Sequence, residues 1–136
     1  MEWIKWSNQY SVNVKKIDEQ HKKLVEMINE LYNAMSNEGK GNDVLGKIIE
    51  RLAEYAVYHF GTEEDLFKKF TYPGYAAHKT EHEGFVAKVV DFQDKFNKKT
   101  VLLTIEVLQF LKDWLLNHIL KTDKTYTSFL NQNGIY

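Results

Sequence analysis

The chain of 136 residues is 43% hydrophobic and 14% aromatic, a composition that suits one packed globular domain. Its formal net charge of −1, with acidic and basic residues intermixed, excludes a basic stripe for nucleic acid and an acidic tail. The lack of cysteine excludes disulfides, thiolate-ligated zinc, iron–sulfur clusters and thioether-attached haem. Residues 1–15 show no secretory signal and no apolar run is long enough to span a membrane, so we expect a cytoplasmic protein.

Residues 1–16 are expected to form an extended arm that lies over the core. Trp3 and Trp6 are not spaced for a long helix, and Val12 and Val14 alternate with polar residues. We interpret the tryptophans as anchors of this arm rather than as ligand-binding residues.

A first helix is predicted from about Asp18 to Ser36, because apolar residues recur there at steps of three and four. Asp18 is the expected N-cap, and Gly39 and Gly41 are expected to end the helix. His21 lies within the apolar stripe, where a single histidine is more often a core residue than a ligand.

A second helix is predicted from residue 42 or 43 to about residue 70. His59 and Glu63 both fall on its apolar stripe, because residues four apart lie on the same face of a helix. A carboxylate buried without a partner is strongly destabilising, so Glu63 needs a cationic partner or a metal ion. Glu64 and Asp65 lie off this face and are interpreted as solvated surface.

The segment 72–74 reads Tyr-Pro-Gly, which indicates a helix end and a turn that sends the next helix back along the second. This third helix is predicted over residues 75–97. His78 and His82 are four apart on its apolar face and therefore point the same way.

A fourth helix is predicted from about Val101, after a polar loop at residues 97–100. Its apolar stripe includes His118, and a C-terminal segment with Tyr126 is expected to add a further turn or two of helix. Four amphipathic helices joined by short loops predict an all-α protein, an antiparallel up-down four-helix bundle. The expected single domain covers residues 1–136, with the arm at about 1–16, the bundle at about 17–120 and the C-terminal segment at about 121–136.

Polar residues with metal-binding side chains gather on the predicted inward faces. Histidine is usually half exposed, yet every histidine of the chain falls on an inward stripe, together with the carboxylates of Glu63 and Asp123. Such a cluster indicates a metal site. His118 and Asp123 are five apart, about 140° on an ideal helix. They converge only if the metal lies between their directions or if the helix is locally wound wider. The histidines are His21, His59, His78, His82 and His118.

The motifs of the chain resemble those of the hemerythrin family, and more narrowly the single-domain bacterial hemerythrins. The match covers about residues 3–130. Phe67 stands where many relatives carry methionine, and we expect only repacking from this departure. The matching motifs are Asp18-x-Gln20-His21, His59-Phe60-x-x-Glu63-Glu64, Tyr72-Pro73, His78-x-x-x-His82-x-x-Phe85 and Trp114-Leu115-x-x-His118-Ile119-x-x-x-Asp123.

The resemblance implies a centre of two non-haem iron ions bridged by two carboxylates and an oxo or hydroxo group. These ligands fill all but one position of two six-coordinate irons, and dioxygen would bind at that position, on the iron with two histidines. Mixed nitrogen and oxygen ligands in this number suit six-coordinate iron better than tetrahedral zinc. The implied ligands are His78, His82 and His118 for one iron, His21 and His59 for the other, and Glu63 and Asp123 as bridges.

Apolar residues near these ligands in sequence are expected to wall a dry oxygen pocket, as well as serving as ordinary core. A dry pocket slows the loss of oxidised oxygen species that would leave a ferric centre. Tyr126, three residues beyond Asp123, is interpreted either as a hydrogen-bond donor that orients that carboxylate or as a packing residue. The pocket residues are Leu24, Phe60, Leu115 and Ile119 by their spacing, and Trp114 by resemblance to the family.

The expected function is reversible dioxygen binding for oxygen storage, transport or delivery, without enzymatic activity beyond a weak oxidase or peroxidase reaction. Histidines outnumber carboxylates here, the reverse of the carboxylate-rich oxygen-activating bundles, which favours binding over activation. The alternatives are a di-iron enzyme with peroxidase, nitric-oxide or iron-oxidising activity, and an oxygen sensor. Dioxygen is the expected partner of a monomer that binds no nucleic acid, and the sequence identifies no electron-transfer or oxygen-accepting protein.

Overall fold

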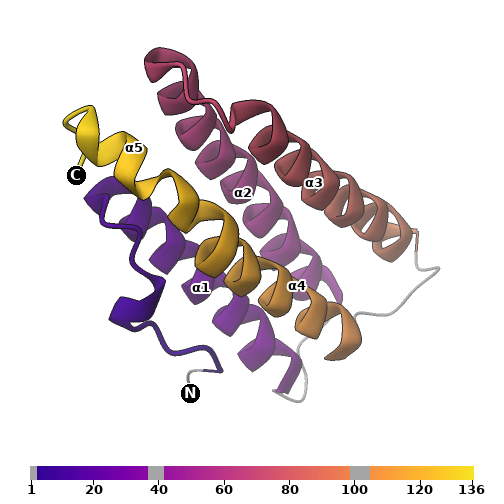
Figure 1. The fold of residues 1–136 in the computed structure, drawn as a ribbon. Helices are drawn as coiled ribbons and strands as arrows, with labels where there is room; N and C mark the ends of the chain where they lie inside the picture. The colour runs from indigo at the N-terminus through magenta and orange to yellow at the C-terminus, as the bar shows by residue number, and fades with distance from the viewer. Residues whose placement is uncertain (1–2, 37–41, 99–104) are drawn as a thin grey trace.

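The computed structural model describes residues 3–36, 42–98 and 105–136 (Figure 1). Within these ranges no strand occurs and no helix combines the length and apolarity needed to cross a membrane. The main helices are α1 (Lys15–Ser36), α2 (Asn42–Phe70), α3 (Tyr75–Asn97), α4 (Ile105–Asn117) and α5 (Thr127–Gln132). Shorter turns are the 3-10 turn η1 (Asn8–Tyr10), the π-helical turn η2 (His118–Thr122) and the 3-10 turn η3 (Asp123–Tyr126).

Helices α1 to α4 form the predicted antiparallel four-helix bundle, in which consecutive helices run in opposite directions (Figure 1). Helix α1 packs against α2 and α4, and α2 packs against α3. The chain leaves α4 through η2 and η3 without a sharp turn and ends in α5. Buried polar side chains come from α1, α2, α3 and the continuation of α4 in η2 and η3, and together they form a polar centre.

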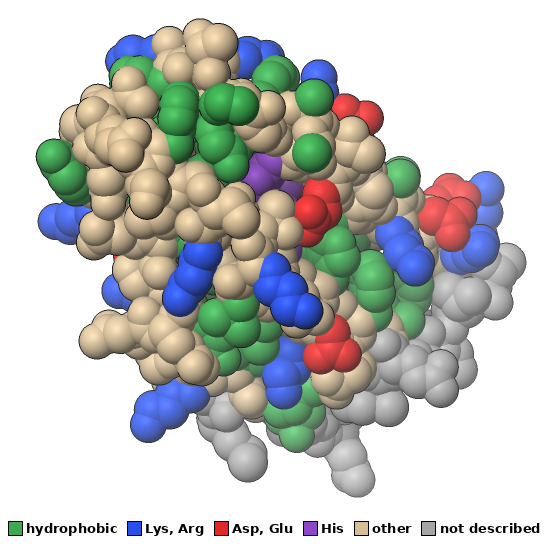
Figure 2. All heavy atoms as spheres, viewed as in Figure 1, with side chains coloured by type: hydrophobic (Ala, Val, Ile, Leu, Met, Phe, Trp, Pro, Cys, Tyr) green, Lys and Arg blue, Asp and Glu red, His purple; other side chains and the backbone are tan. Residues whose placement is uncertain are grey.

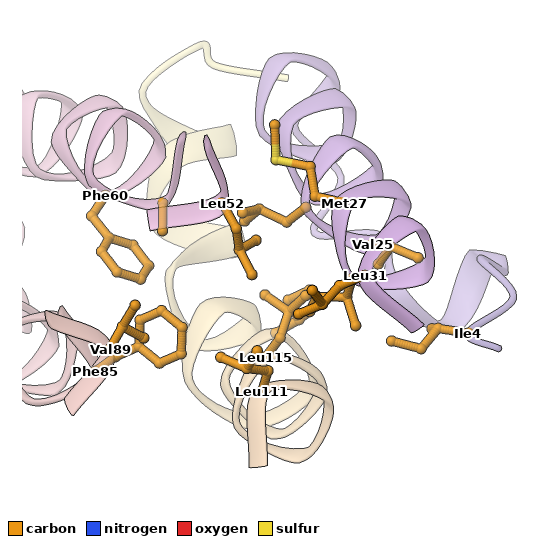
Figure 3. Close-up of a cluster of buried hydrophobic side chains, with 14 of the residues drawn as sticks. Ile4, Val25, Met27, Leu31, Leu52, Phe60, Phe85, Val89, Leu111 and Leu115 are labelled. Atoms are coloured by element: carbon orange, nitrogen blue, oxygen red, sulfur yellow. The ribbon is translucent and has the colours of Figure 1, made fainter. Parts of the chain in front are cut away.

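Apolar stripes meet on the bundle axis to form a continuous core. Figure 3 shows Leu31, Leu111 and Leu115 pointing toward one another from α1 and α4, and all three are buried. Burying one such side chain contributes about 1.5–3 kcal/mol, so these contacts stabilise the packing of the helices against one another.

The N-terminal arm lies over the bundle as predicted, although η1 interrupts its extended course. The indole of Trp3 stacks on Tyr32 with ring centroids 4.8 Å apart, which supports its expected role as an anchor. The side-chain amide of Asn29 accepts a hydrogen bond from the Ile4 N–H at 2.7 Å and donates one to the Ile4 carbonyl at 2.8 Å. Val12 is buried, so the arm also contributes to the core.

Helix α1 begins at Lys15, so the prediction that Asp18 is its N-cap is wrong. The Asp18 carboxylate lies in the first turn and accepts hydrogen bonds from the Val12 N–H at 2.8 Å and the Ser11 hydroxyl at 2.6 Å. Partners in the arm satisfy this carboxylate, so it does not cap its own helix. The bounds of α2 and α3 agree with the predictions, whereas the predicted helix end at Gly39 and Gly41 and the start at Val101 lie outside the described residues.

Candidate metal centre

The side chains predicted as ligands lie together at the centre of the bundle in two overlapping groups. In each group one nitrogen or oxygen atom per residue lies within 4.8 Å of all the others, and every member is buried. Figure 2 shows little histidine surface on the face drawn, next to an acidic side chain. The three-histidine group is Glu63, His78, His82, His118 and Asp123, and the two-histidine group is His21, His59, Glu63 and Asp123.

The π-helical turn η2 brings His118 and Asp123 together. The backbone N–H of Asp123 donates to the carbonyl of His118, five residues earlier, where an α-helix would bond across four. The wider turn leaves Nε2 of His118 only 2.9 Å from Oδ1 of Asp123. The sequence allowed two ways for His118 and Asp123 to face the same metal, and the structure shows the locally wider helix.

Several buried polar atoms at the centre face one another without forming a hydrogen bond. Oδ1 of Asp123 is 3.0 Å from Nε2 of His78, yet neither atom has a hydrogen-bond partner among the described residues. The Nε2 atoms of His82 and His118 approach to 3.1 Å. Neighbouring donors of a six-coordinate cation with bonds of about 2.1 Å lie about 3 Å apart. The spacing and the unpartnered buried atoms fit ligands of metal ions better than a hydrogen-bonded core.

Electrostatics give the candidate ligands different protonation states. Burial lowers the pKa of His59 to about 4, against the pull of Glu63, so this imidazole is neutral at physiological pH. Burial and Asp123 raise the pKa of Glu63, but the surrounding imidazoles outweigh both and the net pKa is low. Burial lowers the pKa of His78, but the nearby carboxylates of Asp123 and Glu63 outweigh burial and raise the pKa to about 9. A metal ion must therefore displace a proton from His78 but not from His59.

Comparison with known proteins agrees with this geometry. Residues 12–130 match the family model described as the hemerythrin HHE cation binding domain. The chain belongs to the hemerythrin family. Its relatives include a bacteriohemerythrin of Methylococcus capsulatus, 36% identical over 87% of this chain and 88% of that protein. A bacteriohemerythrin of Clostridium acetobutylicum is 34% identical over 89% of this chain and 96% of its own length.

The hemerythrin fold also appears in the structural comparison. A crystal structure of wild-type hemerythrin superposes with a TM-score of 0.87 at 34% identity, covering 93% of this chain and 96% of that one. Similarity extends to a hemerythrin-like protein of Naegleria gruberi, 34% identical over 92% of both chains. The predicted fold and family are thus confirmed.

The outer nitrogens of three hemerythrin-centre histidines are held by side chains on other helices. Nδ1 of His59 is 2.7 Å from Oε1 of Gln20, a neutral amide oxygen. Since an amide oxygen can only accept, the proton of His59 lies on Nδ1, and Nε2 keeps its lone pair for the centre. The Nδ1 atoms of His82 and His118 likewise face carboxylates, Glu64 at 3.0 Å and Glu81 at 2.6 Å.

Sequence reasoning did not find these partners. Glu64 was interpreted as solvated surface, but its side chain is only 18% exposed and meets His82 of α3, so that interpretation is wrong. Glu81 carried no sequence signal beyond standing next to His82, and Gln20 appeared only as a member of a family motif, without a role. Each of these partners contacts a histidine on a different helix, so only packing of the hemerythrin bundle reveals the pairing.

Tyr126 contacts the centre as a hydrogen-bond donor, but to a different carboxylate from the one expected. Its hydroxyl donates to Oε2 of Glu63 at 2.5 Å and not to Asp123. Residues three apart in a 3-10 turn are nearly eclipsed, so Tyr126 lies over Asp123 and its longer side chain reaches α2. Burial and the charge of Glu63 raise the pKa of Tyr126 well above its ordinary value, so the hydroxyl remains a donor.

Aromatic rings pack directly on the candidate ligands. Phe60 stacks on His82 with centroids 3.9 Å apart, and Trp114 stacks on His118 at 4.5 Å. Phe67 packs on His78 at 4.9 Å and is fully buried. Leu24, Leu115 and Ile119 are buried members of the core around this centre, and their part in an oxygen pocket stays a prediction.

Proposed function

We propose that this protein binds dioxygen reversibly at two non-haem iron ions, for oxygen storage, transport or delivery. The observation that carries the proposal is that Glu63 and Asp123 belong to both ligand groups while the remaining histidines divide three to two. Shared carboxylates suit a pair of metal ions, and the unequal division leaves one ion with fewer protein ligands. The family description, a cation binding domain, supports metal binding at this place.

The proposed ligands follow the two groups. His78, His82 and His118 would hold one iron, His21 and His59 the other, and Glu63 and Asp123 would bridge them together with an oxo or hydroxo group. When bound, the di-iron pair supplies the electrons and the coordination position that dioxygen binding requires. Because the two-histidine group offers one ligand fewer, its metal ion would keep a coordination position for a small molecule.

The surroundings of the two groups favour binding over further oxidation. Five imidazoles and two carboxylates carry less negative charge than the carboxylate-rich sets of oxygen-activating bundles, and anionic donors are what stabilise highly oxidised iron. Phe60 and Ile119 are buried, and an apolar wall of this kind keeps water and anions away from the iron. We therefore propose that the protein binds dioxygen and is not an enzyme.

Tyr126 has a defined part in this proposal. Its hydroxyl holds one oxygen of Glu63, so the other oxygen, Oε1, stays directed toward Nε2 of His82 at 3.2 Å. A donor that cannot ionise at physiological pH keeps this bridging carboxylate in one orientation whether or not dioxygen is bound.

The test is the absorption spectrum of the reduced, iron-loaded protein under nitrogen, after dioxygen is admitted, and after dioxygen is removed. A charge-transfer band that appears with dioxygen and disappears on its removal supports the proposal. Immediate, irreversible conversion to a ferric spectrum would contradict it and favour a di-iron enzyme with peroxidase, nitric-oxide or iron-oxidising activity.

A further inference from the structure

The two ligand groups differ in what lies behind their imidazoles. In the three-histidine group, Nδ1 of His82 and Nδ1 of His118 both face carboxylate oxygens, those of Glu64 and Glu81. In the two-histidine group, Nδ1 of His59 faces a neutral amide, and Nδ1 of His21 is buried without a hydrogen-bond partner among the described residues. Among the described residues, the carboxylates that face outer imidazole nitrogens therefore lie behind the three-histidine group.

Glu81 is held in place from a second direction. The Thr122 hydroxyl lies 2.9 Å from Oε1 and 3.0 Å from Oε2 of Glu81, and Oε1 is also the atom that faces His118. Thr122 is the last residue of η2, the same turn that begins at His118. The turn that aims His118 at the centre thus also supplies the hydroxyl that fixes its carboxylate partner.

Both carboxylates reach the protein surface while their histidines do not. The side chain of Glu64 is 18% exposed and that of Glu81 is 37% exposed, whereas His82 and His118 are buried. Water can therefore stabilise the charge of each carboxylate, so it can stand behind a buried imidazole without the full cost of burial.

A carboxylate that accepts from the outer N–H of an imidazole makes the inner nitrogen a stronger metal donor. Hydrogen bonds to charged acceptors are about twice as strong as those to neutral ones, and loss of such an outer partner costs about 10–100-fold in metal affinity. An amide in the same place, as at Gln20, polarises its histidine less.

We propose that Glu64 and Glu81 are positioning residues that make the three-histidine group bind its metal ion first and more tightly than the two-histidine group. The inference rests on the proposed two-metal centre. It adds that the half of the centre with room for dioxygen is the half that fills last and loses its metal first.

The test is a titration of the metal-free protein with Co²⁺, an absorbing probe of ligand number, against a competing chelator. Two stepwise binding constants are expected for the unchanged protein. Glu64→Gln and Glu81→Gln keep the size of the side chain and an acceptor oxygen but remove the charge. Each should weaken the first constant by about 10-fold or more and change the second much less.

Three further variants separate the outer carboxylates from other causes. Glu83→Gln makes the same charge change one residue beyond His82, at an exposed residue of neither group, and should leave both constants unchanged. Thr122→Val frees Glu81 without changing charge and should weaken the first constant less than Glu81→Gln. Gln20→Glu puts a carboxylate behind His59, within reach of the Thr62 hydroxyl, and should strengthen the second constant.

The outcomes distinguish the inference from the proposed function. If the protein binds two Co²⁺ ions but Glu64→Gln and Glu81→Gln act no more strongly than Glu83→Gln, or weaken both constants equally, the inference is overturned and the two-metal centre stands. If the unchanged protein binds only one ion, the proposed function fails as well. Circular dichroism of each metal-free variant measures its helix content, so that binding constants are compared at equal folded fraction. If a glutamine variant does not fold, Thr122→Val still tests the role of Glu81, because it leaves both carboxylates in place.

Discussion

The backbone N–H of Asp123 donates to the carbonyl of His118 across five residues, and this single wide turn is what places both side chains at the same centre. On an α-helix the same spacing of five residues would separate the two side chains by about 140°. Asp123 belongs to both ligand groups, so the winding of one turn affects both proposed metal ions.

Inserting an alanine after Leu120 should place Asp123 six residues after His118, a separation of about 240° on an α-helix. Asp123 would then point away from the centre, and iron content should fall below two per chain while total helix content is retained. Elemental analysis and circular dichroism measure the two quantities. Leu120→Ala is the matched control, because Leu120 is 37% exposed and its truncation should leave iron content unchanged. Full iron content in the insertion variant would show that the spacing of His118 and Asp123 does not determine metal binding.

Replacing a candidate ligand should lower the iron content, and the loss should be larger for a residue that belongs to both ligand groups. His78→Ala and Glu63→Ala should each reduce it, and Glu63→Ala should lose both ions because Glu63 belongs to both groups. His21→Ala affects only the two-histidine group and should retain about one iron per chain. The di-iron assignment fails if protein expressed aerobically in iron-rich medium contains one metal ion, or two zinc ions.

Removing metal by chelation should destabilise the fold. The buried ligand atoms then lack partners, and each unsatisfied buried polar atom costs about 1–3 kcal/mol. Metal at 100 times its dissociation constant stabilises by about 2.7 kcal/mol, so the metal-free protein should melt roughly 10 °C lower. Equal melting temperatures with and without metal, measured by calorimetry, would mean that the centre does not couple the four helices.

Metal uptake should release protons at neutral pH. The pKa of His78 is raised to about 9 in the metal-free protein, so its imidazole is protonated at pH 7 and must lose that proton to bind metal. Metal affinity should therefore rise with pH up to about 9, while the protonated His78 stabilises the metal-free fold below pH 6.5 and loses this effect as pH rises through about 9.

Calorimetric titration in two buffers of different ionisation enthalpy counts the protons released. His59, with its pKa lowered to about 4, is already neutral and should contribute none at pH 7. Replacing His78 by alanine should reduce the count, and an unchanged count would show that the proton comes from another ligand.

Leu115 should matter to the oxygenated protein beyond its packing. Leu115→Ala should cost about 2–5 kcal/mol in stability, because the side chain is buried, and should open the proposed pocket wall to water. Dioxygen should still bind, but the oxygenated form should decay faster to the ferric state. Leu108, fully buried two turns earlier in α4, is the matched control: Leu108→Ala should destabilise without changing decay. If both variants decay alike at equal folded fraction, Leu115 is only a core residue.

Local periodicity was sufficient to predict much of this molecule. Residues four apart share a helix face whatever surrounds them, so the pairs His59 and Glu63, and His78 and His82, could be assigned to inward stripes from sequence alone. Pro73 ends a helix by its own covalent structure, which predicted the turn between α2 and α3. The family followed from the same spacings and is confirmed by the match over residues 12–130.

Contacts between helices were decided only by the tertiary structure. The spacing of His118 and Asp123 allowed two routes to convergence, and packing of the centre selected the wider turn. Glu64, Glu81 and Gln20 each find a histidine on another helix, and Tyr126 reaches Glu63 rather than its near neighbour in sequence. A hydrogen bond between side chains far apart in sequence depends on helix rotation and separation, which the whole core sets together, so no local pattern contains it.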